Sequence, residues 1–111
     1  MRLEIVTADR REAFALLGGA EVALDQRIDL GDGLSATYRG SRVQKSPGYP
    51  ALTAFEVAVP AGLGAPAAAE RLWLWLKAGL PAKPQGLSVD GAEIRFKEAL
   101  LKRTVIAKLG G

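Results

Sequence analysis

The clearest pattern in the sequence is an alternation of apolar and charged residues over residues 20–30. The apolar positions share one parity, which only Gln26 interrupts: Ala20, Val22, Leu24, Ile28 and Leu30. The charged residues Glu21, Asp25, Arg27 and Asp29 occupy the other parity. A period of two is typical of a strand with one buried and one exposed face. We therefore predict a strand over residues 20–30.

A second strand should return from this one through a tight turn. Gly31-Asp32-Gly33 supplies turn residues, and Leu34, Ala36 and Tyr38 continue the alternation beyond it. The pattern slips after Tyr38, because Val43 falls on the opposite parity. We expect a β-bulge at Gly40 to account for that slip.

Four further segments have the composition of strands. Leu3 to Thr7 predicts a short N-terminal strand. Leu52 to Val59 predicts another strand, with Phe55, Val57 and Val59 inward. Residues 87–89 and 92–94 flank Asp90-Gly91, a dipeptide that strongly favours a two-residue hairpin turn.

The principal helix is predicted over residues 66–78. Pro66 suits the first turn of a helix, and Gly79 followed by Pro81 suits its end. At 100° per residue, one apolar stripe faces the sheet: Ala65, Ala68, Ala69, Leu72, Leu76, Gly79 and Leu80. The stripe predicts that this helix covers one face of the sheet.

Two shorter helices are predicted near the ends of the chain. Asp9 can cap a helix over Arg10 to Leu17, with Glu12 completing a capping box. Residues 97–109 carry mixed signals, since Glu98 to Lys102 favours a helix whereas Thr104 to Ile106 favours a strand. We predict a possible C-terminal helix there.

Together these elements predict a single α+β domain over residues 1–111. Its sheet should be mainly antiparallel, with about five to six strands, and the 66–78 helix should lie on one face. A chain of 111 residues is long enough to enclose one core.

Composition narrows the chemistry that this domain can perform. The chain has no Cys and no His, which removes thiolate nucleophiles, zinc-thiolate sites and the commonest general base. We therefore predict a non-catalytic protein with no metal and no cofactor. The absence of cysteine and of an apolar signal-peptide core predicts a cytoplasmic protein. The longest apolar run, Leu72 to Leu76, is too short to cross a membrane.

That same run predicts a site, because its five residues span the whole circumference of the helix. One sheet cannot cover all of them. Either the C-terminal segment covers the rest, or Trp73, Leu74 and Trp75 form a contact surface for another protein or for a second copy. The second reading predicts a small accessory, inhibitor or immunity-type protein.

Nucleic-acid binding is an alternative suggested by charge. Up to Ala36 the chain carries a net charge of −3, whereas the remainder carries +6. Arg39, Arg42 and Lys45 could follow a phosphate backbone while Tyr38 and Tyr49 stack on bases. Arg39 and Arg42 have opposite parities, so this reading needs the bulge at Gly40.

The last residues suggest a third possibility. The C-terminal Gly110-Gly111, after an apolar segment, resembles the tail of ubiquitin-like proteins. The order from Leu52 onward is also similar to the latter part of that fold, if Thr104 to Leu109 is a strand. The resemblance implies conjugation or carriage through Gly110 and Gly111.

Overall fold

The computed structural model describes residues 1–19, 22–43 and 50–110. Six strands lie in these parts of the chain: β1 (Arg2–Thr7), β2 (Arg27–Gly31), β3 (Leu34–Val43), β4 (Ala51–Ala58), β5 (Gly86–Val89) and β6 (Ala92–Ile94). The helices are α1 (Arg10–Phe14), which continues as the short 3₁₀ helix η1 (Ala15–Leu17), α2 (Ala65–Gly79) and α3 (Glu98–Lys108).

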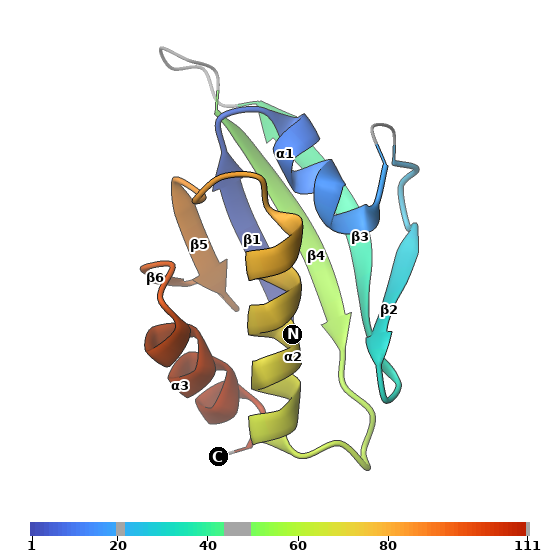
Figure 1. Ribbon diagram of the computed structural model, residues 1–111, viewed down its shortest axis with the longest axis vertical. Helices are drawn as coiled ribbons and strands as arrows, with labels where there is room; N and C mark the ends of the chain where they lie inside the picture. Colours follow the sequence, from blue (N-terminus) through green and yellow to red (C-terminus); the bar gives the residue numbers. More distant parts are fainter. Residues whose placement is uncertain (20–21, 44–49, 111) are drawn as a thin grey trace.

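The strands form one sheet in the order β2-β3-β4-β1-β5-β6, and every neighbouring pair is antiparallel. The N-terminal strand β1 lies between β4 and β5, so both halves of the chain contribute to the centre of the sheet. All three α-helices lie on the same face of this sheet (Figure 1). The predicted α+β class is confirmed, with a principal helix, a short N-terminal helix and a C-terminal helix.

Both predicted hairpins form. Asp32 and Gly33 have φ values of 54° and 83°, and Asp90 and Gly91 have φ values of 48° and 85°. Positive φ at both central residues defines the type I′ turn, whose twist suits a two-residue hairpin. The second hairpin pairs Leu87 with Ile94 and Val89 with Ala92, as the sequence predicts.

The irregularity predicted in β3 also forms. The register between β3 and β4 shifts between Tyr38 and Ser41, and Gly40 adopts a φ of 114°. This conformation is costly for residues with a Cβ, which explains why a glycine stands here.

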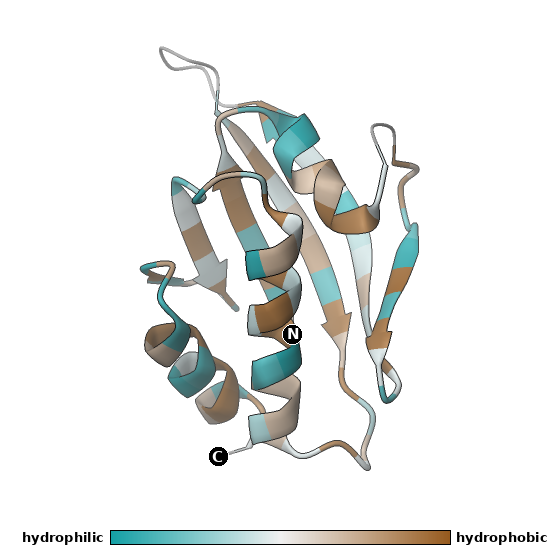
Figure 2. Cartoon of the chain, in the orientation of Figure 1, coloured by the Kyte–Doolittle hydropathy of each residue, from teal (hydrophilic) through white to brown (hydrophobic). Residues whose placement is uncertain are grey.

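The strand predicted over residues 20–30 is wrong in its first part, because β2 begins only at Arg27. Asp25 has a φ of 68°, and the amide of Gln26 donates to the carbonyl of Ala23, so the chain turns there. Leu24 is consequently 65% exposed, although its parity predicts burial. Ala20 and Glu21 lie outside the described residues. Alternation survives along β2 itself (Figure 2).

The helix termini follow the local signals in the sequence. Asp9 accepts from the backbone of Arg11, and the side chain of Glu12 accepts from the backbone of Asp9, which completes the predicted capping box. Pro66 lies in the first turn of α2. The C-terminal segment is a helix, as predicted, in spite of its β-branched residues.

The core lies between the helices and the covered face of the sheet. Fully buried side chains come from both layers, and the largest are Phe55, Leu3, Ile5, Leu34, Leu72, Leu76 and Leu101. Phe14, Tyr38, Phe55 and Trp75 form a chain of aromatic contacts with ring centroids 5.4 to 6.2 Å apart. The chain of rings links α1, the sheet and α2.

At its C-terminal end α2 packs closely against η1. A Cβ added to Gly79 would lie 2.7 Å from Cδ2 and 3.3 Å from Cα of Leu16. Leu16 is itself buried, so it has little room to move. Glycine at position 79 therefore sets how closely η1 approaches α2.

We predict that Gly79→Ala lowers the free energy of unfolding by about 1–3 kcal/mol, because it overpacks this contact. Gly62→Ala is the matched control, since a Cβ at Gly62 meets nothing within 4 Å. Urea denaturation of both variants measures the difference. An unchanged urea midpoint for Gly79→Ala would contradict this prediction, because it would show that the contact with Leu16 does not exclude a Cβ at position 79.

Candidate functional site

The structure distributes the apolar run of α2 over several environments. Leu72 and Leu76 are fully buried in the core, as the predicted stripe requires. Trp73 and Trp75 lie on opposite shoulders of this stripe, and Leu74 lies on the outer side. Trp73, Trp75 and Leu74 therefore each contact a different part of the structure.

Trp73 is covered by the C-terminal part of the chain. Its ring centroid lies 4.9 Å from that of Phe96, which precedes α3, with an angle of 36° between the rings. The amine of Lys77 lies 5.6 Å from the centroid of Trp73. Only 7% of Trp73 is exposed. The C-terminal segment of the protein itself therefore covers Trp73, which is the first of the two alternatives that the sequence left open, and little of this side chain is accessible to a partner.

Trp75 is covered from the other shoulder by η1 and β4. Its indole Nε1 donates a hydrogen bond of 2.9 Å to the carbonyl oxygen of Leu16. Its ring meets Phe55 edge to face, with centroids 5.4 Å apart. Trp75 remains partly exposed. The role of η1 as a cover was not predicted, because nothing local in residues 15–17 indicates which part of the helix they meet.

Leu74 is the exposed remainder of the run, with 56% of its surface accessible. It borders a hollow of about 300 Å³ between α2 and the edge strand β2, together with Trp75, Leu30, Arg71 and Asp29. Arg71 crosses the hollow, donating to the carbonyl of Leu30 at 3.3 Å and forming an ion pair with Asp32. Of the predicted protein-binding residues, Leu74 and Trp75 thus remain accessible.

The bulge at Gly40 brings Arg39 and Arg42 to the helix-free face of the sheet. Together with Arg2 they line a hollow of about 360 Å³. Arg39 also forms an ion pair with Asp25. Tyr38 points the opposite way, into the core, so it offers no stacking surface. Lys45 and Tyr49 lie outside the described residues, and nucleic-acid binding here stays a prediction.

The C-terminus does not complete the topology of a ubiquitin-like fold. Thr104 to Lys108 belong to α3, so the strand that the resemblance needs is absent from the described residues. Gly110 follows α3 with a φ of 118° and is exposed. Gly111 lies outside the described residues. The likeness is therefore limited to the order of β4, α2 and the β5–β6 hairpin and to the two C-terminal glycines of the sequence.

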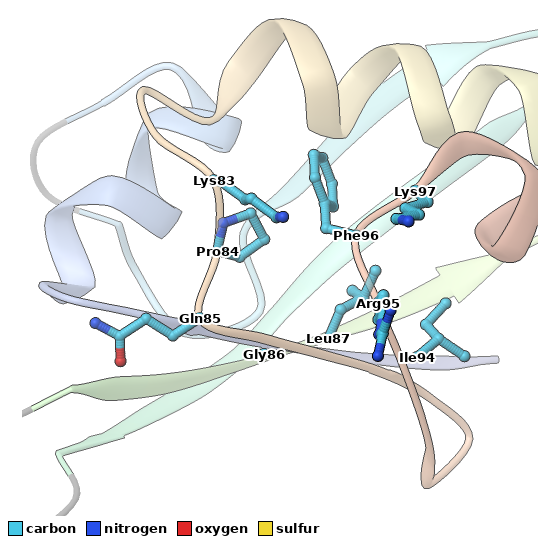
Figure 3. Close-up of a pocket in the computed structure, with 9 residues that line it drawn as sticks. All are labelled: Lys83, Pro84, Gln85, Gly86, Leu87, Ile94, Arg95, Phe96 and Lys97. Carbon is cyan, nitrogen blue, oxygen red and sulfur yellow. The ribbon is translucent and has the colours of Figure 1, made fainter.

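A basic cleft that sequence reasoning missed lies between the loop after α2 and the segment that leads into α3. It measures about 500 Å³, and its walls include Lys83, Arg95, Phe96 and Lys97 (Figure 3). These bases come from two loops that are separated in sequence by the β5–β6 hairpin. Only the sheet topology shows that the two loops face each other.

The shifted carboxylate pKa values belong to ion pairs on the surface. The hydrogen bond from Arg11 lowers the pKa of Asp9, and the hydrogen bond from Lys102 lowers the pKa of Glu98. Asp9 caps α1, and Glu98 lies in the first turn of α3. Neither carboxylate lines one of the hollows described above. These pairs favour the starts of helices and do not indicate a catalytic group.

The described residues contain no cluster of three or more His, Cys, Asp or Glu side chains suited to a metal ion. No helix in the described parts of the chain is long and apolar enough to span a membrane. Comparison of the chain with protein-family models, with curated proteins and with solved structures gave no match.

We predict that Trp75→Phe lowers the free energy of unfolding by about 1–3 kcal/mol, since it removes the hydrogen bond to Leu16 and part of the buried ring. Leu74→Ala on the same helix should change it by less than about 0.5 kcal/mol, because Leu74 is largely exposed. Chemical denaturation of the two variants compares these costs. Equal losses would contradict the different environments of the two side chains.

Proposed function

We propose that this protein is a small non-catalytic binding module that recognises another protein through the hollow between α2 and β2. The observation that supports it is the exposure of Leu74 at the middle of the principal helix, next to a partly exposed tryptophan. Tryptophan is enriched at the centres of protein interfaces, and the exposed Leu74 extends the apolar surface beside it.

The shape and polarity of the hollow favour insertion of a side chain from a partner. Leu30, Leu74 and Trp75 supply apolar contacts, whereas Asp29 and Arg71 lie among the same lining residues. A volume of about 300 Å³ is small, at the lower end of the range for binding pockets. The partner should therefore present one apolar anchor with polar groups around it.

Several protein classes could use such a surface, including an accessory protein, an inhibitor or an immunity-type protein. The partner is either a different protein or a second copy of this chain. Both possibilities place Leu74 inside the interface, so one variant tests both.

Leu74→Asp should leave the monomer folded, because the new carboxylate points into solvent, and should weaken association by at least about tenfold through loss of an apolar anchor. Sedimentation velocity measures self-association. Affinity capture with mass-spectrometric identification, followed by titration of the captured partner, measures binding to another protein.

Val43→Asp is the matched control for this experiment. Val43 has the same exposed fraction as Leu74, 56%, but lies at the end of β3 and does not line the hollow. Both variants remove one exposed apolar side chain and add one negative charge. If the two variants bind equally well to the same partner, the hollow is not the contact surface.

A further inference from the structure

The basic cleft lies on a different part of the molecule from the hollow at Leu74. The Lys83 to Leu87 segment forms one wall, and the Ile94 to Lys97 segment forms the other. The cleft measures about 500 Å³, within the range of small-molecule sites. It is therefore large enough for a ligand of several connected groups.

The cleft is positively charged, and no acidic residue among its lining residues compensates that charge. Lys83, Arg95 and Lys97 line it. None of these three bases takes part in an ion pair within residues 1–19, 22–43 and 50–110. Three uncompensated cations around one cavity favour an anion with more than one charge.

The acid that follows Lys97 in the sequence does not neutralise the cleft. Glu98 follows Lys97 directly, but its carboxylate pairs with Lys102, one turn further along α3. The pKa of Glu98 is lowered mainly by Lys102, with a smaller contribution from Lys77. Since α3 begins directly after Lys97, the positive end of the helix dipole adds to the same side of the cleft.

An aromatic ring is the second property of the cleft. Phe96 is only half-buried, and its ring packs against Trp73 at a tilt of 36°, with centroids 4.9 Å apart. Figure 3 shows the side chain of Lys83 reaching toward Phe96, whereas Gln85 points away from it. Leu87 and Ile94 add apolar surface beside the ring. A planar group could therefore pack against Phe96 while an anion meets the bases.

From this combination we infer that the cleft binds a small ligand that joins a phosphate group to a planar ring, which is the chemistry of a mononucleotide. Phosphate carries up to two negative charges and three acceptor oxygens, which suit one guanidinium and two ammonium groups. Phe96 provides the surface on which the ring lies. This binding does not depend on the proposed protein contact at Leu74.

Calorimetric titration with adenosine 5′-monophosphate tests the inference, with inorganic phosphate and adenosine as the two halves of the ligand. We expect the nucleotide to bind at least about tenfold more tightly than either half, because it uses both the charges and the ring. The double variant Arg95→Ala/Lys97→Ala should lose about tenfold or more of this affinity.

Arg103→Ala/Lys108→Ala is the matched control, since it removes the same charge from exposed positions of α3 that do not line the cleft. If the double variant Arg95→Ala/Lys97→Ala fails to fold, Lys83→Glu replaces it as the test. This variant reverses one charge of the cleft in an exposed loop. It should lose at least as much affinity. Phe96→Leu should weaken binding of the nucleotide and leave binding of inorganic phosphate unchanged.

Three results would overturn the inference. One is the absence of saturable nucleotide binding at millimolar concentration. Another is an equal loss of affinity in the control double variant, which would show unspecific attraction to a basic protein. Tighter binding of a single-stranded oligonucleotide than of the mononucleotide would assign the cleft to nucleic acid instead.

Discussion

The rest of the structure depends on how the apolar residues around α2 are covered. A sheet can bury only one stripe of a helix, but Leu72 to Leu76 place large side chains around the whole circumference. Three separate parts of the chain cover these side chains. The sheet covers Leu72 and Leu76, η1 accepts the hydrogen bond of Trp75, and Phe96 packs against Trp73. The positions of the N-terminal and C-terminal helices follow from these needs.

This arrangement also explains where binding surfaces remain. Leu74 stays exposed because the sheet, η1 and α3 cover the other sides of the helix. Arg95 and Lys97 flank Phe96 in the sequence. When Phe96 packs against Trp73, these two bases lie on the wall of the cleft that faces Lys83. One packing requirement therefore creates both the hollow at Leu74 and the basic cleft.

Local signals in the sequence predicted most of the fold. Asp90-Gly91 and Asp32-Gly33 determine their hairpins through the twist of their own turns, and Asp9 with Glu12 determines the start of α1. The predicted strand failed over residues 22–26 because the alternation of residue types cannot reveal the left-handed conformation of Asp25. The sequence left open whether the C-terminal segment covers α2. It did not indicate that Phe96 would lie on Trp73 or that η1 would cover Trp75, because these contacts join residues 23 and 59 positions apart. Such contacts depend on the order of strands in the sheet.

The fluorescence of Trp73 alone tests the central claim most directly. In a Trp75→Phe background Trp73 is the only tryptophan, since the chain has two. Because Phe96 covers Trp73, we expect emission shifted to the blue and weak quenching by acrylamide in the native state, with both changing to solvent-like values on unfolding. Red-shifted, readily quenched emission from the folded protein would contradict it. The C-terminal segment would then not cover α2, and neither the hollow nor the cleft would have the form described.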